Sequence, residues 1–132
     1  MLHAWIRFFE CLLHLSYKLP LKKWQAQGEE DKKIVAATKK NIQTRFKKEL
    51  GLIIDRPKPG FGSTNDGNTA RRFFESYELS AAITGIDKDL INRFGIIMKV
   101  ISSGYKINIE KFQHYTKTTA EIFIKFLVSY AS

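Results

Sequence analysis

The chain has 132 residues, with 22 lysines and arginines against 13 aspartates and glutamates, a formal net charge of +9. This length is that of one domain, and a single cysteine excludes a disulfide framework or a zinc site built from thiolates. The charge is uneven, because residues 1–75 carry 15 bases and 8 acids whereas residues 76–132 carry 7 and 5. A basic half beside a nearly neutral half predicts a nucleic-acid face joined to a packing half.

Residues 2–19 predict a helix that is apolar on most sides and that Pro20 ends or kinks. Arg7, Glu10 and His14 interrupt it, which argues against a secretory signal and against a membrane span. Two interpretations stay open. The segment is either the central helix of a small bundle or an exposed apolar helix that docks on a partner protein.

A second helix is predicted from the acidic run Glu29–Asp31 to about Leu50, with Gly51 as its stop. Its bases are Lys32, Lys33, Lys39, Lys40, Arg45, Lys47 and Lys48. Because some of these lysines repeat every seven residues, they share one face that could follow a phosphate backbone. A merely solvated lysine face is the alternative. The net charge favours DNA contact, and we predict as contacts Lys39, Lys40, Lys47 and Lys48.

The middle of the chain predicts a glycine-rich loop between two helices. Residues 52–54 form a short apolar run, which we expect to be an extended anchor because a lone strand has no partner. Positive φ angles are expected at Gly60, Gly62 and Gly67. Asp66 or Asn68 is the expected cap of the next helix.

Arg71 and Arg72 fall in the opening turns of this next helix, where the helix dipole disfavours bases. A glycine loop, a helix N-terminus and two guanidinium groups together predict a phosphate clamp, to which Lys58 and Asn68 also belong. The alternative is that Arg71 pairs with Glu75 and that both arginines point into water.

The second half of the chain predicts scaffold helices. Ala70, Phe73, Phe74 and Tyr77 form one apolar stripe of a helix that ends at Gly85. Asp87 is the expected cap of a helix over residues 88–103 that stops at Gly104. Asn108 is the expected cap of a last helix to about Tyr130, with a buried side of Phe112, Tyr115, Ala120, Phe123, Phe126, Leu127 and Tyr130. The predicted fold is all-α, with about five helices around the glycine-rich central loop.

Motifs for catalysis are missing from the sequence. Cys11 has no base partner at a recognisable spacing, and the loop lacks the Gly-Lys-Ser/Thr ending of a nucleotide-binding loop. Asp55 and Asp66 are the acids near the proposed clamp, and a two-metal nuclease needs more carboxylates than these. We therefore expect no enzyme activity, no metal and no cofactor.

Residues Gly67-Asn68-Thr69-Ala70-Arg71-Arg72-Phe73-Phe74, preceded by the basic helix, resemble a stretch of the recombination-activating protein 1 and Transib transposase superfamily. That family has a Gly-Asn-x-Ala-Arg-Lys stretch in the helical region inserted into its RNase H-like core. Residues 2–6 resemble the stretch that carries the family's second catalytic aspartate, but Trp5 stands at the aspartate position. A tryptophan cannot bind Mg²⁺, so the resemblance implies a region without complete chemistry.

By this resemblance, Arg71 and Arg72 match a dibasic pair implicated in DNA contact. We expect one helical domain over residues 1–132, a fragment or decayed copy of a larger transposase-like core. Its expected function is non-catalytic DNA binding through the phosphate backbone, in the nucleus or cytoplasm. The expected partners are DNA and either the rest of a transposase core or a second copy in a homodimer, with no membrane. The alternative function is a protein-interaction module that docks through its apolar first helix.

Overall fold

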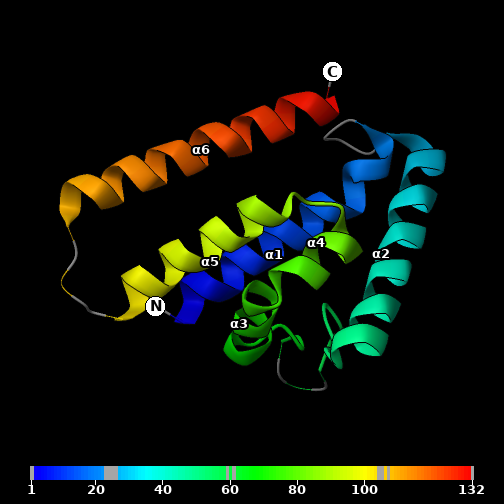
Figure 1. Ribbon diagram of the computed structural model, residues 1–132. Coiled ribbons are helices and arrows are strands. Elements are labelled where there is room, and N and C mark those ends of the chain that lie inside the picture. Colours follow the sequence, from blue (N-terminus) through cyan, green and yellow to red (C-terminus); the bar gives the residue numbers. More distant parts are fainter. Residues whose placement is uncertain are drawn as a thin grey trace.

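The computed structural model describes residues 2–22, 27–58, 60, 62–103, 106 and 108–131. Within these ranges it holds six α-helices, one short 3-10 helix and no β-strand (Figure 1). The helices are α1 (Leu2–Lys18), η1 (Leu19–Leu21), α2 (Gly28–Leu50), α3 (Gly67–Glu75), α4 (Tyr77–Thr84), α5 (Lys88–Ser103) and α6 (Ile109–Ala131). The predicted all-α fold is confirmed.

Helix α1 is the central helix of the molecule, in contact with α2, α3, α4 and η1. Its apolar side chains Trp5, Phe9, Leu12 and Leu13 are all buried within the chain. The expected exposure of this helix is therefore contradicted, because the chain itself already covers these side chains. Pro20 sits in η1, directly after the end of α1.

Helix α2 stands at one edge of the molecule, across the direction of α1 and α5 (Figure 1). It packs on α1, η1 and α4, and its buried side chains are Ile42 and Phe46. At its end, Gly51 adopts a left-handed φ of 66° and donates its N–H to the Lys47 and Phe46 carbonyls. Both predicted ends of this helix are confirmed to within a residue or two.

The helix expected from the Asp66 and Asn68 region to Gly85 is broken into α3 and α4. The break lies at Ser76, which has a φ of −93° and a ψ of 45°. The fully buried Ser80 hydroxyl donates to the Phe73 carbonyl at 2.7 Å. This bond supplies a hydrogen-bond donor to a carbonyl next to the break. Hydrophobic periodicity did not reveal the break, because the apolar stripe continues across it.

Aromatic rings from several helices meet in the core. Phe73 lies 4.9 Å from Phe9 and 5.8 Å from Phe46, measured between ring centroids. Trp5 meets Phe74 edge-on at 5.6 Å. Helix α5 approaches α3 closely at Gly95, where a Cβ atom would lie 3.2 Å from the Cβ of Phe74. The core thus joins the first helix to the segment that carries the Arg-Arg pair.

Helices α5 and α6 have the predicted caps. The Asp87 carboxylate accepts the Asp89 and Leu90 N–H groups, and the Asn108 side chain accepts the Lys111 N–H at 3.0 Å. The predicted stop at Gly104 lies outside the described residues.

The expected buried side of α6 is only partly right. Ala120 is exposed, which contradicts the expectation, and the Tyr130 side chain is not among those described. The other five residues, Phe112, Tyr115, Phe123, Phe126 and Leu127, are half-buried. Among the described α6 side chains, Thr119 alone is buried, where Arg93 of α5 donates to it at 2.9 Å. The reason is that α6 rests mainly on one neighbour, α5.

Candidate nucleic-acid interface

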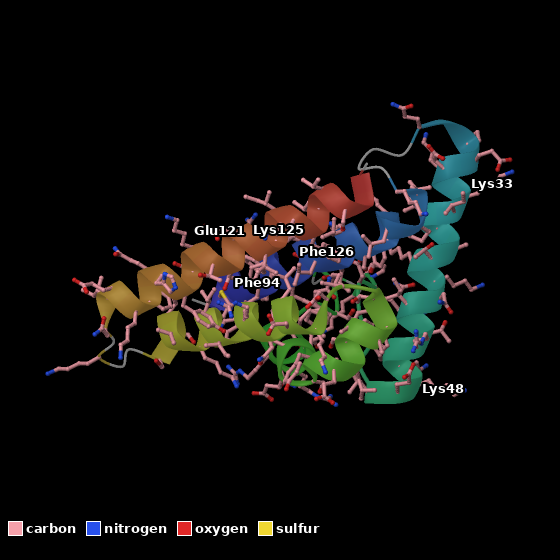
Figure 2. The ribbon with its side chains drawn as sticks, turned by 45° about the horizontal axis from the view of Figure 1, so that its top comes forward. Lys33, Lys48, Phe94, Glu121, Lys125 and Phe126 are labelled. Atoms are coloured by element: carbon pink, nitrogen blue, oxygen red, sulfur yellow. The ribbon has the colours of Figure 1, made fainter. Side chains whose placement is uncertain are left out.

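The basic face of α2 is exposed along the length of the helix. Lys33, Lys40 and Lys47, which we call the lysine row, are exposed and lie seven residues apart, so they project from one side. Lys48 is also exposed, and Figure 2 shows it and Lys33 at the two ends of α2. With a rise of about 1.5 Å per residue, successive lysines of the row are separated by about 10.5 Å along the axis.

Two polar side chains of α2 bind its neighbours. The Gln43 amide donates to the carbonyls of Ile54 and Asp55, at 3.2 and 3.1 Å. Arg45 pairs with Glu49 at 2.8 Å and donates to the Ala82 carbonyl at 3.1 Å, which ties α2 to α4. Arg45 therefore serves packing between helices, and the exposed lysines are the outward positive charges of this helix.

Lys39 differs from its neighbours because it points toward Asp55. Its ammonium lies 3.8 Å from the Asp55 carboxylate and 5.9 Å from the centre of the Tyr17 ring. Because the Asp55 carboxylate already neutralises this ammonium, Lys39 attracts a phosphate less strongly than an unpaired lysine would. Of the four α2 lysines predicted as contacts, Lys40, Lys47 and Lys48 are exposed, and Lys39 is half-buried.

The two arginines of the predicted clamp diverge. Arg72 donates to the Leu50 carbonyl at 2.7 Å and so caps the C-terminal end of α2. Arg71 instead lines a surface hollow of about 430 Å³ whose described lining also includes Trp5, Lys99 and Val100. Neither arginine forms an ion pair with Glu75 in the described part of the chain, which contradicts the alternative reading of Arg71.

The N-terminus of α3 already has an anion, the carboxylate of Asp66. This carboxylate accepts the Thr69 N–H at 2.8 Å, as one of the two predicted caps. That hydrogen bond, with help from the nearby charge of Lys58, holds the pKa of Asp66 below its ordinary value. A phosphate at this helix end would meet a fixed negative charge, which disfavours the predicted clamp. Asn68 is exposed, one turn before the arginines.

The loop before α3 is held by backbone contacts. Lys58 donates its N–H to the Gly62 carbonyl at 3.0 Å, and an isolated antiparallel bridge joins Pro57 to Ser63. Gly60 and Gly62 have the predicted positive φ angles of 77° and 52°. Gly67 does not, because it is the first residue of α3 and takes a helical conformation.

Residues 52–54 form the predicted extended anchor. Leu52 and Ile54 are buried, whereas Ile53 between them is 47% exposed. The segment is not part of a β-strand, and the buried side chains of Leu52 and Ile54 fix the loop to the core. Asp55 follows in a left-handed conformation, with a φ of 52°.

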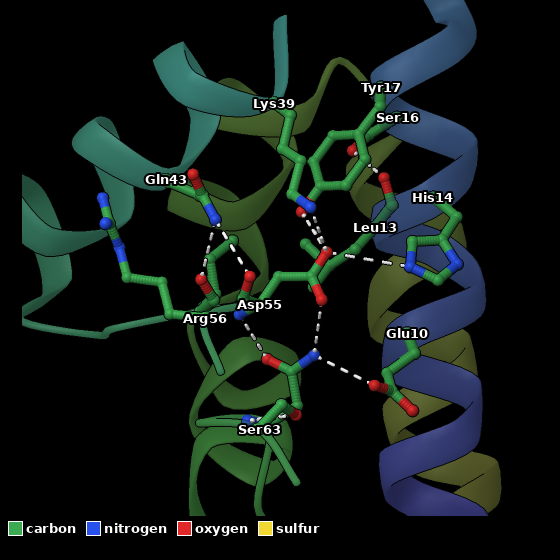
Figure 3. A network of polar contacts seen from close by, with 12 residues as sticks. Glu10, Leu13, His14, Ser16, Tyr17, Lys39, Gln43, Asp55, Arg56 and Ser63 are labelled. Atoms are coloured by element: carbon green, nitrogen blue, oxygen red, sulfur yellow. Dashed lines mark hydrogen bonds and ion pairs between the residues drawn. The ribbon is translucent and has the colours of Figure 1, made fainter. Parts of the chain in front are cut away.

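Asp55 is the centre of a polar network that joins α1, α2 and the loop (Figure 3). Its carboxylate accepts the Tyr17 hydroxyl at 3.0 Å and lies 3.7 Å from His14 Nε2. The Asn65 amide donates to Asp55 at 3.3 Å and to Glu10 at 3.1 Å, while its oxygen accepts the Asp55 N–H at 2.7 Å. Burial first, and then the negative charge of Asp55, raises the pKa of Tyr17 well above its ordinary value.

Sequence reasoning missed this network as a unit. The available signal was the spacing of Glu10, His14 and Tyr17, which places three polar groups on one side of an otherwise apolar helix. Nothing local pointed to Asp55 as their partner, because the contact spans 38 residues between Tyr17 and Asp55. The network anchors the loop, and every buried polar side-chain atom in the described part has a hydrogen-bond partner.

A buried core residue stands where the transposase superfamily carries its second catalytic aspartate. Trp5 is 4% exposed and packs on Phe74. Within the described residues, no group of three or more histidines, cysteines, aspartates or glutamates is placed to hold a metal ion. None of the described helices is both long and apolar enough to cross a membrane.

No protein-family model matches this sequence, and no curated protein matches it. The relation to the transposase superfamily therefore rests on residues 67–74 and the order of the helices, and it stays a prediction.

Proposed function

We propose that this chain binds DNA without catalysis, as a helical region of a transposase of the recombination-activating type. The observation that supports it is the exposed lysine row of α2, on a helix in which only Ile42 and Phe46 are buried among the described side chains. A helix at the edge of the molecule can approach a duplex without displacing the core (Figure 1). The net charge of +9 also favours a negatively charged partner such as DNA.

The mechanism is neutralisation of backbone phosphates. Lysines 33, 40, 47 and 48 each place a flexible ammonium in solvent, and Lys58 and Asn68 flank the neighbouring loop. Each lysine that neutralises a phosphate releases condensed counterions, so binding weakens steeply as salt rises. Backbone contacts of this kind position a protein without reading bases, so we expect little sequence preference.

The experiment is a titration of duplex DNA at several salt concentrations with the variant K33Q/K40Q/K47Q. Three lost phosphate contacts should lower the slope of log K against log salt by about 2.7, since each contact contributes about 0.9. The matched control is K88Q/K106Q/K111Q, which removes the same charge from exposed positions outside α2. We expect the control to keep most of the slope.

Two results would contradict the proposal. If the wild-type affinity barely changes with salt, phosphate neutralisation does not drive binding. If both triple variants lose affinity equally, net charge alone explains the binding and α2 has no special part in it. Circular dichroism and thermal unfolding of each variant show whether the fold is intact.

A further inference from the structure

The outer face of α6 combines apolar and charged residues that have no partner in the described part of the chain. This face, which we call the α6 seam, consists of Lys117, Ala120, Glu121, Ile124, Lys125 and Val128, all of them exposed. Ile124 is 59% exposed and Val128 is 62% exposed. Their spacing of four residues places them on one side of the helix, away from Phe123, which packs on Phe94 of α5 at 5.4 Å between ring centroids.

The charges of the α6 seam also form no ion pair among the residues that the structure describes. Glu121 and Lys125 stand one turn apart, and Figure 2 labels both on α6, yet they form no ion pair with each other in the described structure. Helix α6 runs along the outside of the molecule and rests mainly on α5 (Figure 1). Ile124 and Val128 form an apolar strip, and Glu121 and Lys125 lie beside it. A protein surface with an apolar strip and charges of the opposite sign would complement this face.

We propose that the α6 seam pairs antiparallel with the α6 seam of a second copy of this chain, with the two-fold axis close to Ile124. In this register Ile124 meets its own copy, and Val128 lies opposite Ala120 of the other copy, a large residue against a small one. In an antiparallel pair, residues on the same flank meet, so Glu121 of each copy lies beside Lys125 of the other.

The same charges favour the antiparallel over the parallel arrangement. In a parallel pair the same flank of the two helices lies on opposite sides of the interface, so Glu121 and Lys125 of one copy would not reach Lys125 and Glu121 of the other. In the antiparallel pair, Lys117 lies close to the C-terminal end of the other α6, where the helix dipole favours a positive charge. This surface is separate from the α2 lysine row, so the proposal does not depend on DNA binding.

The first test is sedimentation of the intact chain over a wide range of concentrations. One helix pair is smaller than a standard interface, so we expect a reversible dimer with a Kd in the micromolar range. The variant I124E/V128E should stay monomeric at every concentration. The matched control L79E places a charge at another exposed apolar residue, 41% exposed on α4, and should dimerise like the wild type.

Charge reversal tests the register. E121K and K125E should each weaken the dimer, because each creates two pairs of like charges across the symmetric seam. The double variant E121K/K125E should restore it, and an equimolar mixture of the two single variants should form mixed dimers that neither forms alone. A double variant no better than the singles would overturn the antiparallel register.

Cross-linking gives a second readout that does not depend on weakening the dimer. In a C11S background, I124C should form a disulfide-linked dimer quickly under mild oxidation. K117C should not, because the two copies of residue 117 would be about 21 Å apart along the axis. Equal cross-linking at both positions, or a wild-type chain that stays monomeric at the highest concentration, would overturn the proposal.

Discussion

Arg71 and Arg72 are neighbours in the sequence, but their guanidinium groups serve different parts of the molecule. Arg72 closes the C-terminal end of α2 by donating to the Leu50 carbonyl. Arg71 faces the hollow beside Trp5 and Lys99. A helix turns by about 100° per residue, so consecutive side chains leave it in different directions.

We expect the two arginines to respond differently to replacement. Arg72→Ala removes a charged hydrogen bond to a helix end and should lower the free energy of unfolding by about 1 kcal/mol. Arg71→Ala, at an exposed position without such a bond, should change it by less than about 0.5 kcal/mol. Urea denaturation of both variants measures this. Equal stability combined with an equal loss of DNA affinity would instead restore the phosphate clamp.

Asp66 should make the stability of the protein depend on pH. Its pKa is lower in the folded chain than its ordinary value, so the folded state favours the carboxylate. The stabilisation is therefore present above the ordinary pKa and is lost as the pH falls through the folded value. Asp66→Ala should cost about 1 kcal/mol at neutral pH and less in acid, as measured by urea denaturation.

Asp66→Asn is the matched control for this prediction, because an asparagine can still accept the Thr69 N–H at a helix cap. It should keep most of the stability at neutral pH and should lose the dependence on acid. A penalty for Asp66→Ala that does not change with pH would show that the charge of Asp66 has no part in capping α3.

At the scale of elements, the approach of α3 and α5 depends on a missing side chain. A Cβ atom at Gly95 would lie 3.2 Å from the Cβ of Phe74, which is itself buried against Trp5. Gly95→Val should therefore overpack this contact and lower the free energy of unfolding by about 1–3 kcal/mol. Ile96→Val, at the exposed neighbouring residue, is the matched control and should have little effect in thermal unfolding.

Helices α3 and α4 show how an element can be predicted in type and still be misjudged in extent. Helical periodicity from Ala70 to Tyr77 correctly indicated a helix, and the Gly85 stop is confirmed. The break at Ser76 arises because Phe73 and Phe74 must face the core while α4 packs on α2 and α5. The break therefore depends on packing between helices, which the local sequence pattern does not reveal.

At the scale of the whole molecule, the buried apolar core draws on α1 to α5, and the apolar side chains that α6 adds, such as Ile122, Phe123 and Phe126, are only half-buried. Backbone amides of α6 should therefore exchange with deuterium faster than those of α1, because local opening of α6 exposes little apolar surface. Hydrogen exchange measured by mass spectrometry tests this at a concentration too low for dimers. Equal protection of α1 and α6 would show that α6 unfolds only together with the core.

The two proposed binding surfaces lie on different parts of the molecule. The α2 lysine row lies at the edge of the molecule, and the α6 seam lies along a different helix on the outside (Figure 1). Because the two surfaces are separate, a variant of one should leave the other unaffected. The experiments on DNA affinity and on dimerisation can therefore be interpreted independently.

The sequence by itself determined most of the helices and their caps. Asp66, Asp87 and Asn108 accept N–H groups within three residues, and Gly51 and Gly85 end helices through their own backbone conformation. These are local interactions, so the residue types and their spacing suffice to predict them. The lysine row follows from the same local geometry, because residues seven apart on a helix share a side.

Only the tertiary structure decided which of the predicted contacts are free to meet a partner. Lys39 is engaged by Asp55, 16 positions along the chain, and Arg72 by Leu50, although both look identical to their neighbours in the sequence. Asp55 in turn collects its partners from α1, α2 and the loop. Such pairings depend on how the helices pack against one another, and no spacing along the chain encodes that arrangement.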